Sequence, residues 1–463
     1  MNQGSSAENL EAEAWNPQKT FSIRNLVYTR AGIVALFSWL LWGDFMFQLM
    51  EAVEPKVLPL LLKQHGATNQ QIAFIAGSIM MMLNTFMNPV ISYNSDRTRT
   101  RWGRRKPYII ITTPFVVLFL AATPFAPEIL DCLQTSTLVS NFFAIFPVPP
   151  IIMLFGFLVV AYQIFNLFVA SVYYYLLPDV VPHELLGRFY SLFRIVSGLS
   201  GLIFNYFIFK YAETDAKAIF VGVALIYGIV ILMMCWKIDE GEYPPLAKEK
   251  RGTLWDGISN YGRECFSSKY YWTMFLGSAC INISACSNLF YVFLYNKDLG
   301  YSLDQFGKLS AYVIVLQIIC YYSAGIIIDR WGAHKTLILG LFATAALHIL
   351  SYFMITDYWS GFIWMLLPAF SSTLLLATAK LEVITFPGER YGQFCSAQAL
   401  VKSIAIVGMN YVIGVIADKL QTYWFLNLWK GIFLALSGVF IVLIYLQWLR
   451  RGAREDFRQE DAK

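Results

Sequence analysis

A short charged segment between two long apolar runs constrains this chain more than any other feature. Residues 97–106 carry six basic side chains in ten positions, whereas residues 72–93 and 108–125 on the two flanks carry no charge. Runs of that length can cross a bilayer as helices, which satisfy their own backbone hydrogen bonds inside lipid. The charged segment is then predicted to be a short loop that positive charge holds on the cytoplasmic side.

Composition supports the same class of protein. Of the 463 residues, 57% are hydrophobic and only 14% are charged, against about 25% in ordinary globular proteins. The net charge of +5 is explained by cytoplasmic loops, so no nucleic-acid partner is expected. The expected partners are the lipid bilayer and a small-molecule substrate, and we expect a monomer.

The ends and the cysteines add little further chemistry. The first 19 residues are polar and acidic and show no signal-peptide core, so an N-terminus in the cytoplasm is expected. The seven cysteines show no CxxC spacing, and most lie in apolar runs, where a cysteine acts as a small hydrophobic residue. Neither a metal nor another cofactor is expected.

The apolar runs predict an all-α polytopic membrane protein with 12 transmembrane helices. No Lys or Arg occurs between Pro107 and Gly187, and this asymmetry places both termini in the cytoplasm of a multi-pass protein of the cell (inner) membrane. The expected segments are a cytoplasmic N-terminal segment at 1–31, a six-helix bundle at 32–236, a cytoplasmic linker at 237–269, a second six-helix bundle at 270–449 and a cytoplasmic tail at 450–463.

The two halves are weak repeats of each other. Asp96 corresponds to Asp329 at a shift of 233 residues, and Gln71 corresponds to Gln305 at a shift of 234. Two parallel repeats joined by a cytoplasmic linker are typical of secondary transporters, which hold their substrate near the bilayer midplane between the halves.

Two loop motifs resemble those of a known transporter family. The pattern Gly325-x-x-x-Asp329-Arg330-x-Gly332-x-x-Lys335 resembles the loop motif of the major facilitator superfamily. The copy in the first half, from Asn88-Pro89 through Asp96-Arg97 to Gly103-Arg104-Arg105-Lys106-Pro107, resembles that of the glycoside–pentoside–hexuronide symporters and of the sucrose transporters and their animal relatives. The resemblance implies the major facilitator fold and transport of a sugar or glycoside by alternating access.

Two positions depart from the sodium-coupled members of that group. Those members carry an Asp before the proline of helix 2 and another Asp four residues later, where this chain has Asn88 and Ser92. Sodium prefers anionic oxygen ligands, which an amide and a hydroxyl replace poorly. Coupling to protons is therefore expected, with uncoupled transport as the alternative.

The first helix carries acidic residues that are costly inside a bilayer unless they are paired or functional. Asp44, Gln48 and Glu51 share one helix face, and Asp44 lies about 12 residues into the helix, near the midplane at ~1.5 Å per residue. Asp44 is a candidate to bind a proton or a sugar hydroxyl; the alternative is a structural ion pair. Glu51 and Glu54 have Lys56 as a possible partner.

Further candidates lie at midplane depth in both halves. Lys402 is the most central basic residue of the second half, with Gln398 one turn before it. It can neutralise Asp44 across the cavity or bind an anionic substrate. Neutral polar residues can line a sugar site or serve as hydrogen bonds between helices; these are Asn84, Asn166, Asn282, Asn288 and Gln317.

The repeated loop predicts a cytoplasmic gate. Asp96 is expected to pair with Arg97 or Arg101, or with a helix dipole, and to close the cytoplasmic side of the outward-facing state. Anchoring by positive charge is the alternative, but it does not explain the repeated Asp-Arg and Trp-Gly pairs. The predicted gate comprises Asp96, Arg97, Arg101, Gly103, Arg104, Asp329, Arg330 and Gly332.

Other functional classes fit the sequence less well. No Walker A pattern occurs, which argues against an ATP-driven pump, and no paired catalytic residues indicate an enzyme. The alternatives are an exporter or antiporter of organic anions or drugs, for which Lys402 and Arg194 would suit an anion, and a membrane sensor that does not transport. We expect a secondary transporter that couples uptake of a sugar or glycoside to protons.

Overall fold

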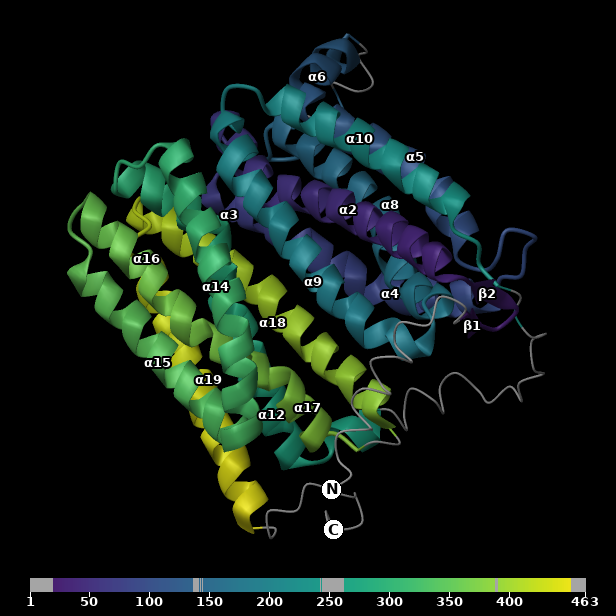
Figure 1. The fold of residues 1–463 in the computed structure, drawn as a ribbon. Helices are drawn as coiled ribbons and strands as arrows, with labels where there is room; N and C mark the ends of the chain where they lie inside the picture. The colour runs from purple at the N-terminus through teal and green to yellow at the C-terminus, as the bar shows by residue number, and fades with distance from the viewer. Residues whose placement is uncertain are drawn as a thin grey trace.

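Twelve helical spans, long and apolar enough to cross a membrane, make up the described part of this chain. The computed structural model describes residues 20–135, 141, 143, 145–241, 243, 262–387 and 390–450. The all-α fold with 12 predicted spans is therefore confirmed (Figure 1). Most of the predicted N-terminal segment, more than half of the central linker and most of the tail lie outside the described residues.

The first bundle starts with α2 (Arg30–Gln64), which continues as a helix through Pro55 and Pro59. The second span joins α3 (Asn69–Ala73), the π-helical turn η1 (Phe74–Ser78) and α4 (Ile79–Arg97). The third joins α5 (Lys106–Ala122), η2 (Thr123–Phe125) and α6 (Ala126–Gln134). The last three are α8 (Pro150–Val180), then η3 (His183–Leu185) with α9 (Leu186–Ile203), η4 (Phe204–Ile208) and η5 (Phe209–Tyr211), and finally α10 (Ala216–Lys237).

The second bundle repeats this arrangement. Its first span joins α12 (Lys269–Ala285), η6 (Cys286–Phe290), α13 (Tyr291–Phe293) and η7 (Leu294–Asp298). The next two spans are α14 (Leu303–Trp331) and α15 (Ala333–Met354). The last three are α16 (Tyr358–Ser372) with η8 (Thr373–Leu376) and α17 (Ala377–Thr385), then α18 (Tyr391–Leu420), and α19 (Phe425–Arg450).

The repeat seen in the sequence has a local structural cause. Gly66 and Gly300 both have positive φ, 81° and 72°, and each turns the chain just before the next span begins. Thr68 with Gln71 and Ser302 with Gln305 then form capping boxes that satisfy the first backbone N–H groups of the two spans. The matching glutamines are therefore equivalent helix caps in the two halves.

A short hairpin precedes the first helix. Strands β1 (Phe21–Ile23) and β2 (Leu26–Tyr28) pair antiparallel, with Phe21 opposite Tyr28. We call the end of the molecule that carries this hairpin and the loop between α4 and α5 the basic end. The bundles lie together at the opposite end, where α3 begins, and diverge toward the basic end (Figure 1).

Candidate functional site

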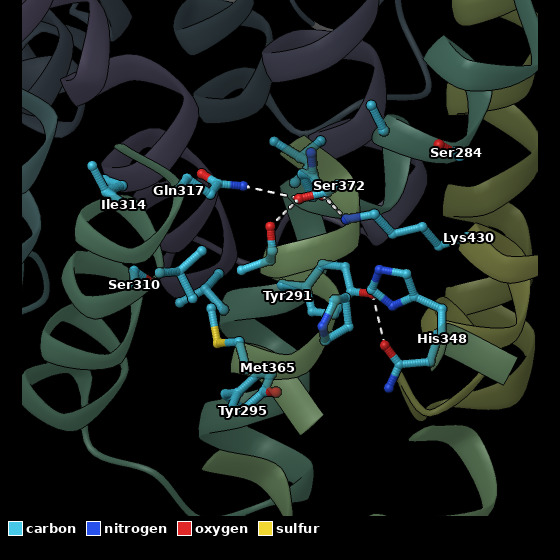
Figure 2. Close-up of a pocket in the computed structure, with 18 of the residues that line it drawn as sticks. Ser284, Tyr291, Tyr295, Ser310, Ile314, Gln317, His348, Met365, Ser372 and Lys430 are labelled. Atoms are coloured by element: carbon cyan, nitrogen blue, oxygen red, sulfur yellow. Dashed lines mark hydrogen bonds between the residues drawn. The ribbon is translucent and has the colours of Figure 1, made fainter. Parts of the chain in front are cut away.

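A cavity of about 470 Å³ lies mainly within the second bundle. Its walls come from α12, η6, α13, η7, α14, α15, α16, η8 and α19, and α2, η4 and η5 of the first bundle close one edge. A volume of this size suits a small-molecule ligand. Figure 2 shows polar side chains from several of these helices around it.

One wall of the cavity is a chain of polar contacts around a lysine. Lys430 Nζ on α19 donates a 2.9 Å hydrogen bond to Asn288 Oδ1 and lies 5.1 Å from the centre of the Tyr291 ring. The Tyr291 hydroxyl donates a 2.7 Å hydrogen bond to Asn427 Oδ1 (Figure 2). His348 of α15 lies beside Lys430 in the same view. We call Lys430, Asn288, Tyr291, Asn427 and His348 the lysine wall.

A second wall carries amide and hydroxyl groups. Gln317 Nε2 on α14 donates a 3.2 Å hydrogen bond to Ser372 Oγ on α16 (Figure 2). Ser310 and Trp364 also line the cavity. Amides, hydroxyls and aromatic faces together suit a polar solute that carries hydroxyl groups.

The edge formed by the first bundle brings a second lysine. Lys56 Nζ on α2 donates a 3.0 Å hydrogen bond to Asn205 Oδ1 and lies 5.2 Å from the centre of the Phe204 ring. The sequence suggested Glu51 or Glu54 as its partner, and that pairing is wrong. Asn205 lies on η4, so Lys56 contacts a residue of another helix and not an acidic residue of its own helix.

The predicted substrate residues are spread over several places. Asn288 and Gln317 line the cavity. Gln398 instead donates a 2.7 Å hydrogen bond to Ser278 Oγ, which ties α18 to α12, and Asn282 donates to the Ser278 carbonyl within its own helix. Asn84 lies on α4 and is not among the described residues that line the cavity.

Asp44 is fully buried within the first bundle, outside the cavity lining. Its carboxylate accepts hydrogen bonds from Ser197 Oγ at 2.7 Å and from Gln48 Nε2 at 3.3 Å; Gln48 also donates to the Tyr174 hydroxyl at 3.1 Å. Arg194 on α9 acts on Asp44 electrostatically. Among the described residues, no ion pair involves Asp44.

Two further acidic residues of α2 contact amides of α8. Asn166 Nδ2 donates a 2.5 Å hydrogen bond to Glu51, and Gln163 Nε2 donates to Glu54. Both amides are buried. Glu51 of the predicted acidic face thus contacts a neutral amide of α8. Glu54 makes the same kind of contact and extends this face.

Lys402 does not neutralise Asp44. Its Nζ lies 3.3 Å from the Glu382 carboxylate of α17, so the ion pair stays within the second bundle. Lys402 and Glu382 are 20 residues apart, too far for a helical repeat to predict their contact. Of the two roles suggested for Lys402, neutralisation of Asp44 is therefore not found, and binding of an anionic substrate stays a prediction.

A set of hydrogen bonds closes the opposite end between the bundles. Asp418 on α18 accepts from the backbone N–H groups of Asn69 at 2.8 Å and Gln70 at 2.9 Å. The Tyr423 hydroxyl donates to Asn69 Oδ1 at 2.8 Å. Burial raises the pKa of Tyr423 to about 12, so this hydroxyl keeps its proton at neutral pH. We call Asp418, Tyr423, Asn69 and Gln70 the latch.

The basic end holds a cluster of ion pairs within the first bundle. Asp179, at the end of α8, contacts Arg24 of the hairpin at 2.7 Å, Arg104 at 2.8 Å and Arg105 at 3.3 Å. Glu240 accepts hydrogen bonds from the backbone N–H groups at the start of α5, including Arg105 at 3.0 Å, and so caps that helix. These contacts fix the charged loop against its own bundle.

The predicted gate residues pair differently from the expectation. Asp96 contacts Arg105 at 2.6 Å and Arg104 at 3.7 Å, not Arg97 or Arg101. Arg97 lies over the Tyr93 ring at 3.9 Å, and Arg101 lies beside the Trp102 ring at 5.2 Å.

The downstream copy of the gate is more exposed. Asp329 contacts Lys380 of α17 at 2.7 Å, and Arg330 is exposed. Gly332, with φ of +81°, ends α14. All these contacts lie within one bundle, and the hydrogen bonds of the described residues that join the two bundles cluster toward the opposite end.

Several residues that build the cavity were missed from the sequence. Lys430 is the clearest case: it is the sixth residue of an apolar helix that crosses the membrane, and a charge at such a place signals a functional residue. His348, which lies in an apolar run, carries a similar signal. Asn205 and Ser372 gave none, because small polar residues are common in helix bundles.

Comparisons with known proteins agree with this architecture. The sequence matches the model of the Major Facilitator Superfamily over residues 40–367 and again over 295–463. No curated protein matches the chain.

Solved structures show the same fold. A bacterial homologue of the human lysosomal transporter Spinster, in an inward-facing and unoccupied conformation, aligns with a TM-score of 0.64 and 13% identity over 92% of this chain and 98% of that one. A D-xylose–proton symporter aligns with a TM-score of 0.64 and 13% identity over 88% and 97% of the two chains. The nucleoside transporter NupG aligns with a TM-score of 0.63 and 12% identity over 89% and 99%. These identities support a shared fold alone, and together with the sequence match they show that the chain belongs to the major facilitator superfamily of secondary transporters.

Proposed function

We propose that this superfamily member imports a sugar or glycoside together with protons. The loop motif that resembles the glycoside–pentoside–hexuronide and sucrose transporters supports this substrate class. The cavity supports it too, because amides, hydroxyls and aromatic side chains line a volume of about 470 Å³, within the roughly 300–1,000 Å³ range of small-molecule sites.

The environment of Asp44 is the observation that carries the proposal of proton coupling. A fully buried carboxyl with hydroxyl and amide partners and no ion pair among the described residues can gain or lose a proton without breaking a salt bridge. Intramembrane carboxyls of this kind commonly serve as proton relays. Glu51 and Glu54, farther along α2, extend the same acidic face.

The proposed orientation places the basic end in the cytoplasm of the cell (inner) membrane, because arginines and lysines concentrate there. With this orientation the latch closes the outer side, and the structure corresponds to an inward-facing state of a monomeric carrier. Transport then requires the two bundles to rock against each other, so that the cavity opens to one side of the membrane at a time. Release of the latch opens the outer side, and the basic ends of the bundles approach each other.

The test of this function is uptake by proteoliposomes under an imposed pH gradient. A thermal-shift screen of the purified protein against sugars, glycosides and organic anions first identifies a ligand, because ligand binding stabilises the native state. Wild-type protein is expected to accumulate that ligand above equilibrium. Asp44→Asn is expected to lose accumulation and to keep exchange of labelled for unlabelled ligand.

Asp304→Asn is the matched control, because Asp304 pairs with Lys308 at the exposed start of α14. It should accumulate the ligand as wild type does. Accumulation by Asp44→Asn at the wild-type level would remove Asp44 from the coupling step, and uptake that ignores the pH gradient in wild type would reject proton coupling.

A further inference from the structure

We infer that the transported solute carries a carboxylate, which the lysine wall binds; this rests on the proposed function, since it takes the cavity as the transport site. The inference concerns the charge of the solute. A sugar or glycoside can be neutral or acidic, and the two differ in what they require of the cavity walls.

The charges around the cavity favour an anion. Among the described residues, its lining contains Lys56 and Lys430 and no aspartate or glutamate. Each ammonium group donates to one neutral amide oxygen, Asn205 Oδ1 or Asn288 Oδ1, and neither forms an ion pair among the described residues. A charge in a low-dielectric interior is costly without a counter-charge, so an anionic solute offsets a cost that a neutral solute leaves in place.

The lysine wall also has spare hydrogen-bonding capacity. An ammonium group has three donors, and Lys430 uses one of them on Asn288. Beside it, the side chains of His348 and Asn427 are 8% and 3% exposed and interact with each other. The two remaining donors of Lys430 are therefore the groups of this wall that can receive a carboxylate.

The opposite side of the cavity suits the remainder of such a solute. Figure 2 shows Gln317 and Ile314 on one side and Lys430 and His348 on the other. Gln317, Ser372 and Ser310 offer amide and hydroxyl groups to hydroxyls of a ligand. The matching chemical class is a small hydroxylated carboxylate.

This class has an electrical consequence. A monoanion that enters with one proton carries no net charge across the membrane, whereas a neutral sugar that enters with one proton carries one positive charge. Membrane potential acts on net charge moved across the bilayer. Uptake of the acid is therefore expected to respond to a pH gradient and not to a potential.

The test uses pairs of compounds that differ in one group. Gluconate and sorbitol share a carbon skeleton and differ at the carboxylate, and lactobionate and lactitol form a larger pair. The dissociation constant of each is measured from thermal shifts of the purified full-length protein. At least one acid is expected to bind about tenfold or more tightly than its polyol, as a charge-assisted hydrogen bond implies.

Variants assign that difference to the lysine wall. Lys430→Gln keeps a donor for Asn288 and removes the charge, so it is expected to weaken the acid about tenfold or more and to leave the polyol unchanged. Lys430→Arg should retain most of the preference. Lys308→Gln, an equal change at an exposed site, should leave the binding of acid and polyol unchanged. If Lys430→Gln is poorly folded, the same difference in dissociation constant is measured in Lys56→Gln.

The outcomes separate this inference from the proposed function. Equal binding of acids and polyols that neither lysine variant alters would overturn the anion preference and leave sugar transport standing. Binding of neutral sugars alone would do the same. Failure of every sugar, polyol and sugar acid to bind would reject both. In proteoliposomes, uptake of the acid that follows an imposed potential at fixed pH would contradict electroneutral entry with one proton.

Discussion

Asp418 near the end of α18 accepts a 2.8 Å hydrogen bond from the backbone N–H of Asn69, the first residue of α3. The same carboxylate accepts from Gln70 at 2.9 Å. A side chain of one bundle thus acts as a helix cap for the other, where the N-terminal end of the helix dipole favours a negative charge. The beginning of α3 therefore depends on contact between the bundles.

Removal of this cap is expected to weaken the contact between the two bundles at the end that lies opposite the basic end. Loss of a capping side chain costs about 1–2 kcal/mol, which corresponds to roughly tenfold faster opening. In Asp418→Ala, hydrogen–deuterium exchange of the backbone over residues 69–78 should accelerate by about that factor. The second half of α8, which ends beside the ion pairs of Asp179 at the basic end, should exchange at the wild-type rate.

Asp304→Ala is the control for this experiment, since it removes an exposed acidic side chain near the same end. It should leave exchange over residues 69–78 unchanged. Wild-type exchange in Asp418→Ala would mean that packing alone, and not the cap, holds the bundles together.

Gly103 is expected to tolerate no side chain. It has a φ of +98°, and a Cβ there would collide with the Glu240 carboxylate, which caps α5. The left-handed backbone alone costs an alanine about 1–2 kcal/mol. Gly103→Ala should therefore lower the melting temperature of the purified protein.

Gly222→Ala in α10 is the control, because no atom lies within 4 Å of the added Cβ. Its melting temperature should match or exceed that of wild type, because alanine favours a helix over glycine. Equal melting temperatures for the two variants would contradict this role for Gly103.

The contact between Lys402 and Glu382 predicts rescue by exchange of the two charges. Lys402→Glu places two carboxylates together, and like charges repel in a partly buried site. It should lower the melting temperature, and the double variant Lys402→Glu/Glu382→Lys should recover most of the loss. Transport by the double variant reports separately on Lys402. Recovered stability with abolished binding would give Lys402 a role at the substrate as well, and no recovery of stability would dismiss the ion pair.

Uptake is expected to be independent of sodium. The Asn88 amide oxygen accepts a 3.2 Å hydrogen bond from Tyr175, and an amide and a hydroxyl at positions 88 and 92 are weak ligands for sodium. Replacement of sodium by choline at fixed pH should leave the initial rate of uptake unchanged. A strict sodium requirement would show that other residues form a sodium site.

Membrane class, the number of spans and the two-fold repeat could be predicted from the sequence. These features depend on the hydropathy of each segment, because lipid requires every spanning segment to satisfy its own backbone hydrogen bonds. Helix caps can also be predicted from the sequence, because the residues that form them are close together in the chain. The match between Gln71 and Gln305 marks two capping boxes, whose partners lie only three residues away.

Partners that are distant along the chain could not be predicted. Lys56 contacts Asn205 and not the nearby acids, and Asp96 contacts Arg105 and not its neighbour Arg97. Which residue an intramembrane charge meets depends on how each helix is rotated about its axis and on which helix packs beside it. The hydropathy of a segment carries little information about either.

The acidic face of α2 could be predicted from the sequence, whereas the cavity depends on the tertiary structure. Helical spacing alone is enough to place Asp44, Gln48 and Glu51 on one face. The lysine wall needed η6, α13, α15 and α19 to be brought together, from positions up to about 140 residues apart, before Lys430 and Asn288 could meet. A helix determines the spacing of its own side chains, but a site shared by several helices exists only after they pack.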